Sequence, residues 1–212
     1  MYKHYIYNSA FRIPNHFISF FQKKITALFL AIAFLCIAAT SSAQVGEALD
    51  FDGADDRVDL PPATYVSGSY TKEAWINTNN LSNLNNIVSG AATAFWAPSA
   101  QLSAGHGGGF TDVIDPTPLV AGTWYHVAVT YNAGTGEMNL YKNGVLVAGP
   151  TVVATYTETQ QYIGAFQGSF LFSGQIDEVR IWNVAKTQTE IAASMNCELS
   201  GDEAGLLAYY SF

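Results

Sequence analysis

The chain has 212 residues, of which 49% are hydrophobic and 12% are charged, with nine basic and seventeen acidic side chains. This composition is typical of a chain that buries an apolar core, and it excludes an intrinsically disordered protein. All seventeen acidic residues but only five basic ones lie in residues 44–212, which therefore carry a net charge of −12. Because nucleic acids and anionic membranes are bound through basic side chains, we expect neither as a partner.

The first 43 residues have the layout of a secretory signal peptide. Lys23 and Lys24 form a basic region, an apolar stretch of about fifteen residues covers 25–39, and small residues follow at Ser41-Ser42-Ala43. The stretch is shorter than the roughly 20 residues that span a bilayer, so an uncleaved membrane anchor is the less favoured alternative. Cleavage after Ala43 predicts a secreted or cell-surface protein with no membrane insertion of the mature part.

Residues 44–212 have the pattern of one all-β domain. Short runs rich in Tyr, Trp, Val, Ile and Phe alternate with clusters of Gly, Asn, Asp and Pro, as in a sandwich or barrel. The expected strands are 48–52, 57–60, 70–77, 124–131, 138–142, 145–147, 161–164, 170–182 and 206–212. The strand pattern is weak over 77–120, and within this range we expect polar loops over 79–86 and 105–109.

Two local signals predict a turn and a helix. Asn143-Gly144 predicts a type I′ hairpin turn, because both residues tolerate the positive φ that this turn requires. Thr187 and Glu190 have the spacing of a capping box, which predicts one short helix that ends near Met195.

An acidic segment near the start of the domain predicts a tight turn. Asp50, Asp52, Asp55 and Asp56 surround Gly53. Calcium takes six to eight oxygen ligands from carboxylates and from backbone carbonyls, and this segment offers both. The alternative is an acidic turn that is simply solvated by water.

The penultimate expected strand contains the pattern of a β-bulge. Ile176 has the opposite parity to Val179 and Ile181, although all three are apolar. A bulge at Asp177-Glu178 would turn all three side chains toward the core and would change the direction in which the Asp177 side chain points. Asp177 is therefore a candidate cation ligand, and an ion pair within the strand is the alternative.

The four tryptophans divide into two groups. Trp75, Trp124 and Trp182 fall inside expected strands, where an indole ring is most simply part of the core. Trp96 lies in the irregular range beside Phe95. It is the candidate for stacking on a ligand, with burial in the core as the alternative.

One short segment matches a catalytic motif in sequence but lacks the other residues that the catalysis requires. His106-Gly107-Gly108-Gly109 is similar to the oxyanion-hole string of lipases and esterases. That chemistry requires a nucleophilic serine within Gly-x-Ser-x-Gly on a parallel α/β fold, and the sequence has neither. A glycine-rich loop is the prediction.

Taken together, these segments resemble the laminin G-like (concanavalin A-like lectin/glucanase) jelly-roll family. The matching segments, in the order of the family, are 48–53 with 55–58, 70–76, 123–131, 140–144 and 176–183, followed by the short helix. The resemblance implies an all-β, two-sheet antiparallel jelly-roll sandwich over 44–212, with one short C-terminal helix. It also implies binding of a glycan or an extracellular protein.

Proteins of this family are frequently one module of a longer bacterial surface protein. The present chain ends within the strand expected over 206–212. We therefore expect it to be the N-terminal module of a longer protein.

The resemblance further implies a calcium ion near the rim or the convex face. In a jelly roll the first and penultimate long strands can meet at an edge, where their carboxylates would repel one another. A divalent ion would offset that repulsion and cross-link the strands. We expect Asp52, Gly53 and Asp177 to hold this Ca²⁺ ion.

A glycoside hydrolase is the alternative function, because the family includes glucanases. Those enzymes carry their carboxylates along one strand as Glu-x-Asp-x-x-Glu, or with one residue fewer, and hydrolysis needs two carboxylates flanking the scissile bond. The acids of 47–52 have another spacing, and the adjacent Asp177 and Glu178 would point to opposite faces of a regular strand. We therefore expect a binding module without catalytic residues.

Overall fold

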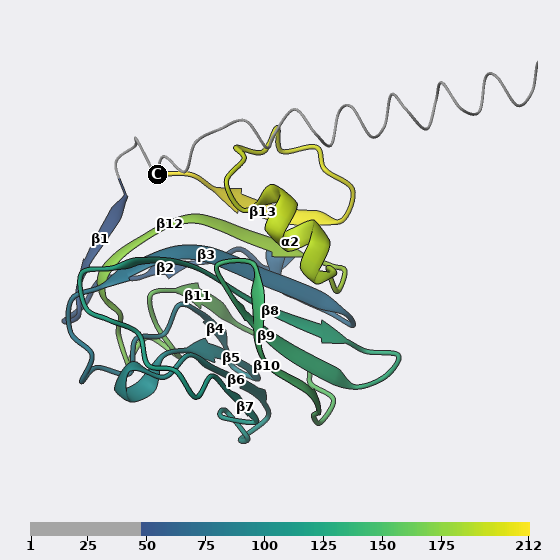
Figure 1. Cartoon of the computed structure of the whole chain (residues 1–212), viewed down its shortest axis with the longest axis horizontal. Coiled ribbons are helices and arrows are strands. Elements are labelled where there is room, and N and C mark those ends of the chain that lie inside the picture. Colours follow the sequence, from purple (N-terminus) through teal and green to yellow (C-terminus); the bar gives the residue numbers. More distant parts are fainter. Residues whose placement is uncertain (1–47) are drawn as a thin grey trace, which may run out of the picture. The chain divides into compact units, whose positions relative to one another are not determined.

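The computed structural model describes residues 48–212, and the signal peptide expected over 1–43 lies outside them. The described part forms two layers of antiparallel strands with one short α-helix, α2 (Gln188–Ser194) (Figure 1). Two 3-10 helices, η1 (Pro62–Thr64) and η2 (Pro98–Ala100), lie in the connections. This is the all-β jelly-roll sandwich that the sequence predicts.

The larger layer is a seven-stranded sheet in which every neighbouring pair is antiparallel. Its order is β1-β12-β3-β8-β9-β10, and β13 also pairs with β12. These strands are β1 (Leu49–Asp52), β3 (Tyr70–Thr78), β8 (Trp124–Asn132), β9 (Glu137–Lys142), β10 (Val145–Val152), β12 (Ser173–Trp182) and β13 (Leu206–Tyr210). The first and last strands lie along the same edge of β12, because β1 pairs with its first half and β13 with its second.

The smaller layer consists of two three-stranded sheets. One has the order β2-β11-β4 and the other the order β5-β6-β7. Their strands are β2 (Val58–Asp59), β4 (Val88–Gly90), β5 (Thr93–Trp96), β6 (Ser103–His106), β7 (Val113–Ile114) and β11 (Gln161–Ile163). The sequence predicts no strand within 77–120, yet β4 to β7 lie there. The expected loop over 79–86 lies between β3 and β4 as predicted, whereas the one expected over 105–109 overlaps the end of β6. The strands β4 to β7 are two to four residues long and rich in Ala, Gly and Ser, so neither propensity nor alternation reveals them.

An apolar core fills the space between the two layers. On β3 the side chains of Tyr70, Ala74 and Ile76 point inward, and each is 0% exposed. Phe95 and Ile163 meet them from the smaller layer and belong to the same cluster of buried residues. Burial of each large apolar side chain contributes roughly 1.5–3 kcal/mol, so this cluster is the main source of stability.

The other face of the large sheet is covered by α2 and the segment around it (Figure 1). Trp75 on β3 donates its indole N–H to the carbonyl of Met195 at 2.9 Å. Ile191 of the helix packs with Ala128 and Tyr141 of the sheet. The sheet therefore buries side chains on both faces, which explains why strands such as β8 are apolar at both parities.

The local predictions for the turn and the helix are confirmed. Asn143 and Gly144 have φ values of 51° and 73°, as a type I′ turn requires, and they connect β9 to β10. At the start of α2, Thr187 Oγ1 accepts a hydrogen bond from the Glu190 backbone N–H at 3.3 Å. The Thr187 N–H in turn donates to Glu190 Oε2 at 2.7 Å.

The predicted bulge in β12 is also confirmed. The pairing of β12 with β3 shifts register just after Asp177, and Glu178 has a φ of 52°. As a result Ile176, Val179 and Ile181 are all 0% exposed and all belong to the core. An unbroken strand would have turned Ile176 away from the other two.

One charged side chain, that of Lys72, lies on the core face of β3 and is 0% exposed. Its Nζ donates hydrogen bonds to Thr93 Oγ1 at 2.8 Å and to the carbonyls of Val88 at 3.0 Å and Thr93 at 3.3 Å. Burial lowers the pKa of Lys72 to about 8, although the carboxylate of Glu158 acts in the opposite direction. The hydrogen bonds compensate part of the desolvation of the ammonium group.

We expect the folded protein to gain stability as the pH rises from about 8 to about 9.5. The pKa of Lys72 is lower in the folded state, so in this window the unfolded chain binds more protons and unfolding becomes less favourable. The gain is about 1.5 kcal/mol and can be measured by urea denaturation at several pH values. The Lys72→Met variant has no titrating amine at this position, and a rise of equal size in that variant would contradict the assignment.

We also expect Gly144→Ala to lower the unfolding free energy by about 2–3 kcal/mol. A Cβ at this position would combine a positive φ with contacts of 3.0 Å to Ala192 Cβ and 3.2 Å to Met195 Sδ. Gly122 is a matched control, since it has the same φ of 73° but no neighbour within 4 Å. Gly122→Ala should therefore cost only about 1 kcal/mol from backbone strain. Equal losses in the two variants would show that the hairpin does not pack against α2.

Candidate functional site

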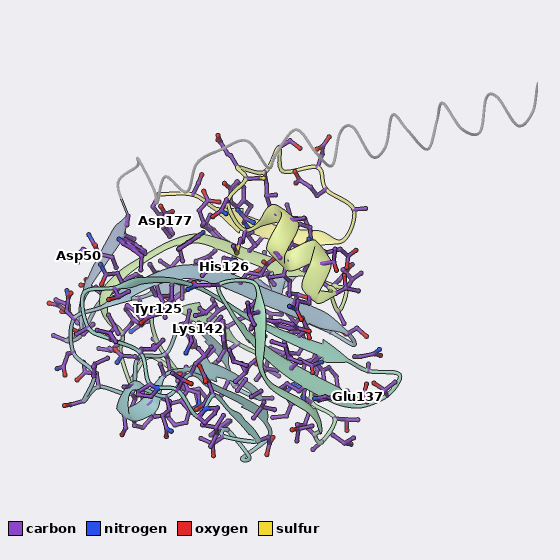
Figure 2. All side chains as sticks on the ribbon, in the orientation of Figure 1. Asp50, Tyr125, His126, Glu137, Lys142 and Asp177 are labelled. Carbon is purple, nitrogen blue, oxygen red and sulfur yellow. The ribbon has the colours of Figure 1, made fainter. Side chains whose placement is uncertain are left out.

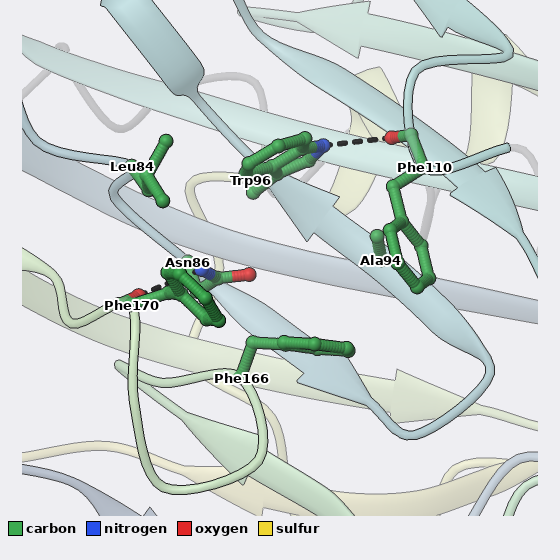
Figure 3. A pocket seen from close by; sticks show the side chains of 7 residues that line it. All are labelled: Leu84, Asn86, Ala94, Trp96, Phe110, Phe166 and Phe170. Carbon is green, nitrogen blue, oxygen red and sulfur yellow. Dashed lines mark hydrogen bonds between the residues drawn. The ribbon is translucent and has the colours of Figure 1, made fainter. Parts of the chain in front are cut away.

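An open pocket of about 260 Å³ lies beside β5 (Figure 3). Its lining residues are Leu84, Asn86, Ala94, Trp96, Phe110, Phe166 and Phe170. They come from the segment before β4, from β5, from the β6–β7 connection and from the β11–β12 connection. Asn86 is the one lining residue whose side chain is neither aliphatic nor aromatic, so the pocket presents mainly carbon surface.

Trp96 forms one wall of the pocket. It is the last residue of β5, and its side chain points to the opposite face of the sheet from that of its neighbour Phe95. Phe95 points into the core and is 0% exposed, whereas Trp96 is half-buried and faces the pocket. Its indole N–H donates to the carbonyl of Phe110 at 2.7 Å. This bond fixes the ring and connects the β6–β7 segment to the wall.

Two phenylalanines reach the pocket from a tight turn between β11 and β12. Phe166 and Ser169 exchange two backbone hydrogen bonds of 2.8 Å each, and Gln167 and Gly168 between them have positive φ values of 49° and 70°. Phe170 follows directly and is 53% exposed. The turn therefore places an aromatic ring at each of its two ends.

The phenylalanine rings form a continuous aromatic surface. The ring centroids of Phe110 and Phe166 are 5.1 Å apart in an edge-to-face arrangement, and those of Phe166 and Phe170 are 6.0 Å apart. Such distances are within the range in which aromatic pairs attract one another. The rings thus support each other although they come from two separate segments.

Asn86 lies at the base of the pocket and is only 2% exposed. Two backbone hydrogen bonds between the neighbours of Asn86 and those of Trp96 hold the two residues side by side. The Ile87 N–H donates to the Phe95 carbonyl at 2.9 Å, and the Ala97 N–H donates to the Asn85 carbonyl at 3.0 Å. Its Nδ2 donates to the carbonyl of Phe170 at 2.7 Å. The Asn86 side chain therefore ties the phenylalanine turn to β5.

The structure places Trp96, the ligand-stacking candidate of the sequence, in the wall of this pocket. Sequence reasoning missed Phe110, Phe166 and Phe170. A usable signal for the last two was Phe166-Gln167-Gly168-Ser169-Phe170, in which a glycine turn separates two aromatic residues. For Phe110 the sequence gives no comparable signal, because only tertiary contacts bring it to Trp96.

The acidic segment forms the tight turn that the sequence predicts. Carboxylate oxygens of Asp52, Asp55 and Asp56 lie within 4.8 Å of one another, and all three residues are exposed. Asp52 Oδ1 accepts the Ala54 N–H at 2.7 Å, Asp56 Oδ2 accepts the Asp52 N–H at 2.9 Å, and Gly53 has a φ of 79°. This turn has oxygen atoms that could contact a cation.

Asp177 does not lie at this turn. Asp52 pairs with Ser173, four positions before Asp177 on β12, which corresponds to about 13 Å along the strand. Asp177 is also 0% exposed, and its Oδ1 accepts the N–H groups of Glu178 at 2.6 Å and Phe212 at 2.9 Å. Because calcium–oxygen distances are about 2.3–2.6 Å, one ion cannot contact both carboxylates. The shared site expected from Asp52, Gly53 and Asp177 is therefore not formed.

A second group of ionisable side chains lies on the helix-covered face of the large sheet. Glu73 and His126 are 0% and 1% exposed, with 3.3 Å between Glu73 Oε2 and His126 Nε2. Figure 2 labels His126, which belongs to β8 of the large sheet. Glu73 Oε1 accepts the indole N–H of Trp182 at 2.7 Å. Burial opposes the charged form of Glu73, but the nearby His126 and the charges of Arg180 and Lys186 outweigh it and lower the pKa. This group is enclosed under α2 and connects strands rather than facing solvent.

The carboxylates of β12 are likewise engaged in structural contacts. Glu178 Oε2 pairs with Arg180 at 2.7 Å and also accepts a hydrogen bond from the Tyr209 hydroxyl at 2.8 Å. The residues that line the pocket include no aspartate or glutamate. The pocket of the described chain therefore has no pair of acids of the kind that glycoside hydrolysis requires.

The chain is thus a jelly-roll sandwich with an aromatic-lined pocket among the loops of its smaller layer. A sequence model of the concanavalin A-like lectin/glucanases superfamily matches residues 52–192, which is more than half of the chain. The chain belongs to this superfamily, which includes both binding modules and glycosidases.

Three solved structures illustrate the similarity. A candidate carbohydrate-binding protein from Bacteroides ovatus is 25% identical, with a TM-score of 0.65, over 77% of this chain and 50% of its own. Domain 4 of an extracellular arabinanase from Geobacillus stearothermophilus, solved with arabinotriose, is 20% identical, with a TM-score of 0.56. The match covers 72% of this chain and 78% of that domain. A heptameric pentraxin from Limulus polyphemus is 21% identical, with a TM-score of 0.52, over 69% of this chain and 81% of the pentraxin chain. The last two show the fold alone, and the chain spans half the length of the first.

No curated protein sequence matches the chain. Within residues 48–212, no helix has the length and apolar character needed to cross a membrane.

Proposed function

We propose that this protein is a secreted or cell-surface module that binds a glycan through the aromatic pocket. The observation that carries the proposal is the convergence of Trp96, Phe110, Phe166 and Phe170 on a hollow of about 260 Å³. A cluster of partly exposed aromatic rings around a hollow is typical of a ligand site. The C–H faces of sugar rings are apolar and pack well on such rings.

The relatives support the same proposal. The chain belongs to a superfamily of lectins and glucanases, and the Bacteroides ovatus neighbour is described as a candidate carbohydrate-binding protein. Binding is favoured over hydrolysis because the lining residues include no carboxylate that could act as acid, base or nucleophile.

The test is a glycan array probed with the purified protein, followed by titration of the best glycan against variants. Phe170→Ala should weaken binding about tenfold, because this half-exposed ring contributes contact surface but little to the core. Trp96→Ala should weaken binding at least as much. Val152→Ala serves as the control, since Val152 is 74% exposed on β10 of the other layer.

If both variants, Phe170→Ala and Trp96→Ala, still bind the glycan as tightly as the unaltered protein, the binding site lies elsewhere on the protein. Absence of binding to every glycan would contradict the proposal. It would favour adhesion to an extracellular protein, for which the edge strand β10 presents the exposed apolar side chains of Val145 and Val152.

We further propose that the turn of Asp52, Gly53, Asp55 and Asp56 takes a calcium ion. Three carboxylates within 4.8 Å of one another repel each other, and a divalent cation would relieve that repulsion. Carboxylate and backbone oxygens of a tight turn are the ligands that calcium prefers. Asp177 has no part in this revised site.

Calcium at a hundredfold excess over its Kd should stabilise the fold by about 2.7 kcal/mol, measured as a rise in Tm that a chelator reverses. Asp55→Asn should abolish this rise. Its carboxylate makes no hydrogen bond within the turn, whereas those of Asp52 and Asp56 do. Asp50→Asn removes a neighbouring exposed charge and should leave the calcium response intact. A Tm that is the same in calcium and in chelator would exclude the site.

A further inference from the structure

The polar atoms of the pocket point to a more specific ligand. The indole N–H of Trp96 donates to the Phe110 carbonyl, and Nδ2 of Asn86 donates to the Phe170 carbonyl, both at 2.7 Å. Because a carbonyl can only accept, the second bond also fixes which end of the Asn86 amide is nitrogen. Each of the two side-chain nitrogens of the lining thus donates one N–H to the backbone.

The side-chain oxygen of Asn86 has the opposite orientation. It points into the space between Trp96, Ala94 and Phe166 (Figure 3). Within residues 48–212 it accepts no hydrogen bond, although Asn86 is only 2% exposed. Because the pocket is open, water can reach this oxygen when no ligand is present. A ligand that displaces the water must supply an N–H or O–H to Asn86 in its place, since an unpaired acceptor costs free energy.

The remaining surface of the pocket is hydrocarbon. A hydroxyl-covered sugar face would lose its hydrogen bonds to water there and find one acceptor in return. The matching group carries a single donor next to an apolar end. At about 260 Å³ the pocket is also below the usual size range of small-molecule sites, which suits one substituent better than several sugar rings.

We propose that the pocket recognises the acetamido group of a 2-acetamido sugar. The methyl group would lie among Trp96, Phe166 and Phe170, and the amide N–H would donate to Asn86 Oδ1. The acetamido carbonyl would face solvent through the open side of the pocket. This inference rests on the proposed function of glycan binding and assigns the class of sugar.

The experiment compares matched ligands on the unaltered protein by calorimetric titration and saturation-transfer NMR. The methyl glycosides of N-acetylglucosamine and N-acetylgalactosamine are each compared with the glycoside that has a hydroxyl in place of the acetamido group. At least one acetamido sugar should bind about tenfold or more tightly than its hydroxyl partner, with the strongest transfer to the acetyl methyl protons. The 2-O-acetyl analogue keeps the methyl group but lacks the N–H, and it should bind roughly fivefold more weakly than the amide.

Asn86→Leu removes the acceptor and should abolish the preference for the amide over the ester. The ligand comparison itself needs no variant, so it stands even if Asn86→Leu loosens the Phe170 turn. Tighter or equal binding of the hydroxyl sugars, still dependent on Trp96, would overturn the acetamido assignment and leave the proposed function intact. Binding of no sugar would overturn both. Binding of Nε-acetyl-lysine as tight as that of the sugars would also overturn the assignment, because the sugar ring would then contribute nothing.

Discussion

At the bulge of β12, the carboxylate of Asp177 accepts two backbone N–H groups, one from Glu178 and one from Phe212. The first bond stabilises the irregular backbone of the bulge, and the second joins it to the end of the described chain. The bulge shifts the register of β12 against β3, and it separates the stretch of β12 that pairs with β1 from the stretch that pairs with β13. Without it, Ile176 and Val179 could not both enter the core.

Strand β3, next to β12, carries buried charges on both of its faces. Lys72 points between the layers and Glu73 points beneath α2, because adjacent residues of a strand alternate in direction. Lys72 finds its acceptors on β4 and β5, and Glu73 contacts Trp182 and His126. A slip of one residue would exchange the two environments and leave both charges without partners, so these costly groups also specify the register.

The candidate ligand pocket depends on this framework without being part of the core. The short strand β5 orients Trp96, and backbone pairing holds Asn86 beside it. The connection from β11 to β12 then brings Phe166 and Phe170 opposite the indole ring. Recognition residues on loops that a rigid sandwich positions are a common arrangement, since the loops can vary while the sheets remain. Here the loops are fixed further by side-chain bonds to their carbonyls.

The sequence by itself determined the elements whose signals are local. The aromatic and β-branched runs of the long strands, the Asn143-Gly144 turn and the capping box of α2 each depend on residues a few positions apart, and each is confirmed. The bulge could also be inferred, because three apolar residues of one strand had to share a face. Of the candidate pocket only Trp96 was identified, from its place outside the expected strands.

Tertiary structure decided what depends on long-range pairing. The strands β4 to β7 are only two to four residues long, so only their partners and their burial define them. The register of β1 against β12 separates Asp52 from Asp177, which no property of either segment alone reveals. Likewise Phe110 meets Trp96 only because β5 and β6 pair and the next connection folds back. Contacts of this kind are absent from local sequence patterns because they arise when distant segments are brought together by a common core.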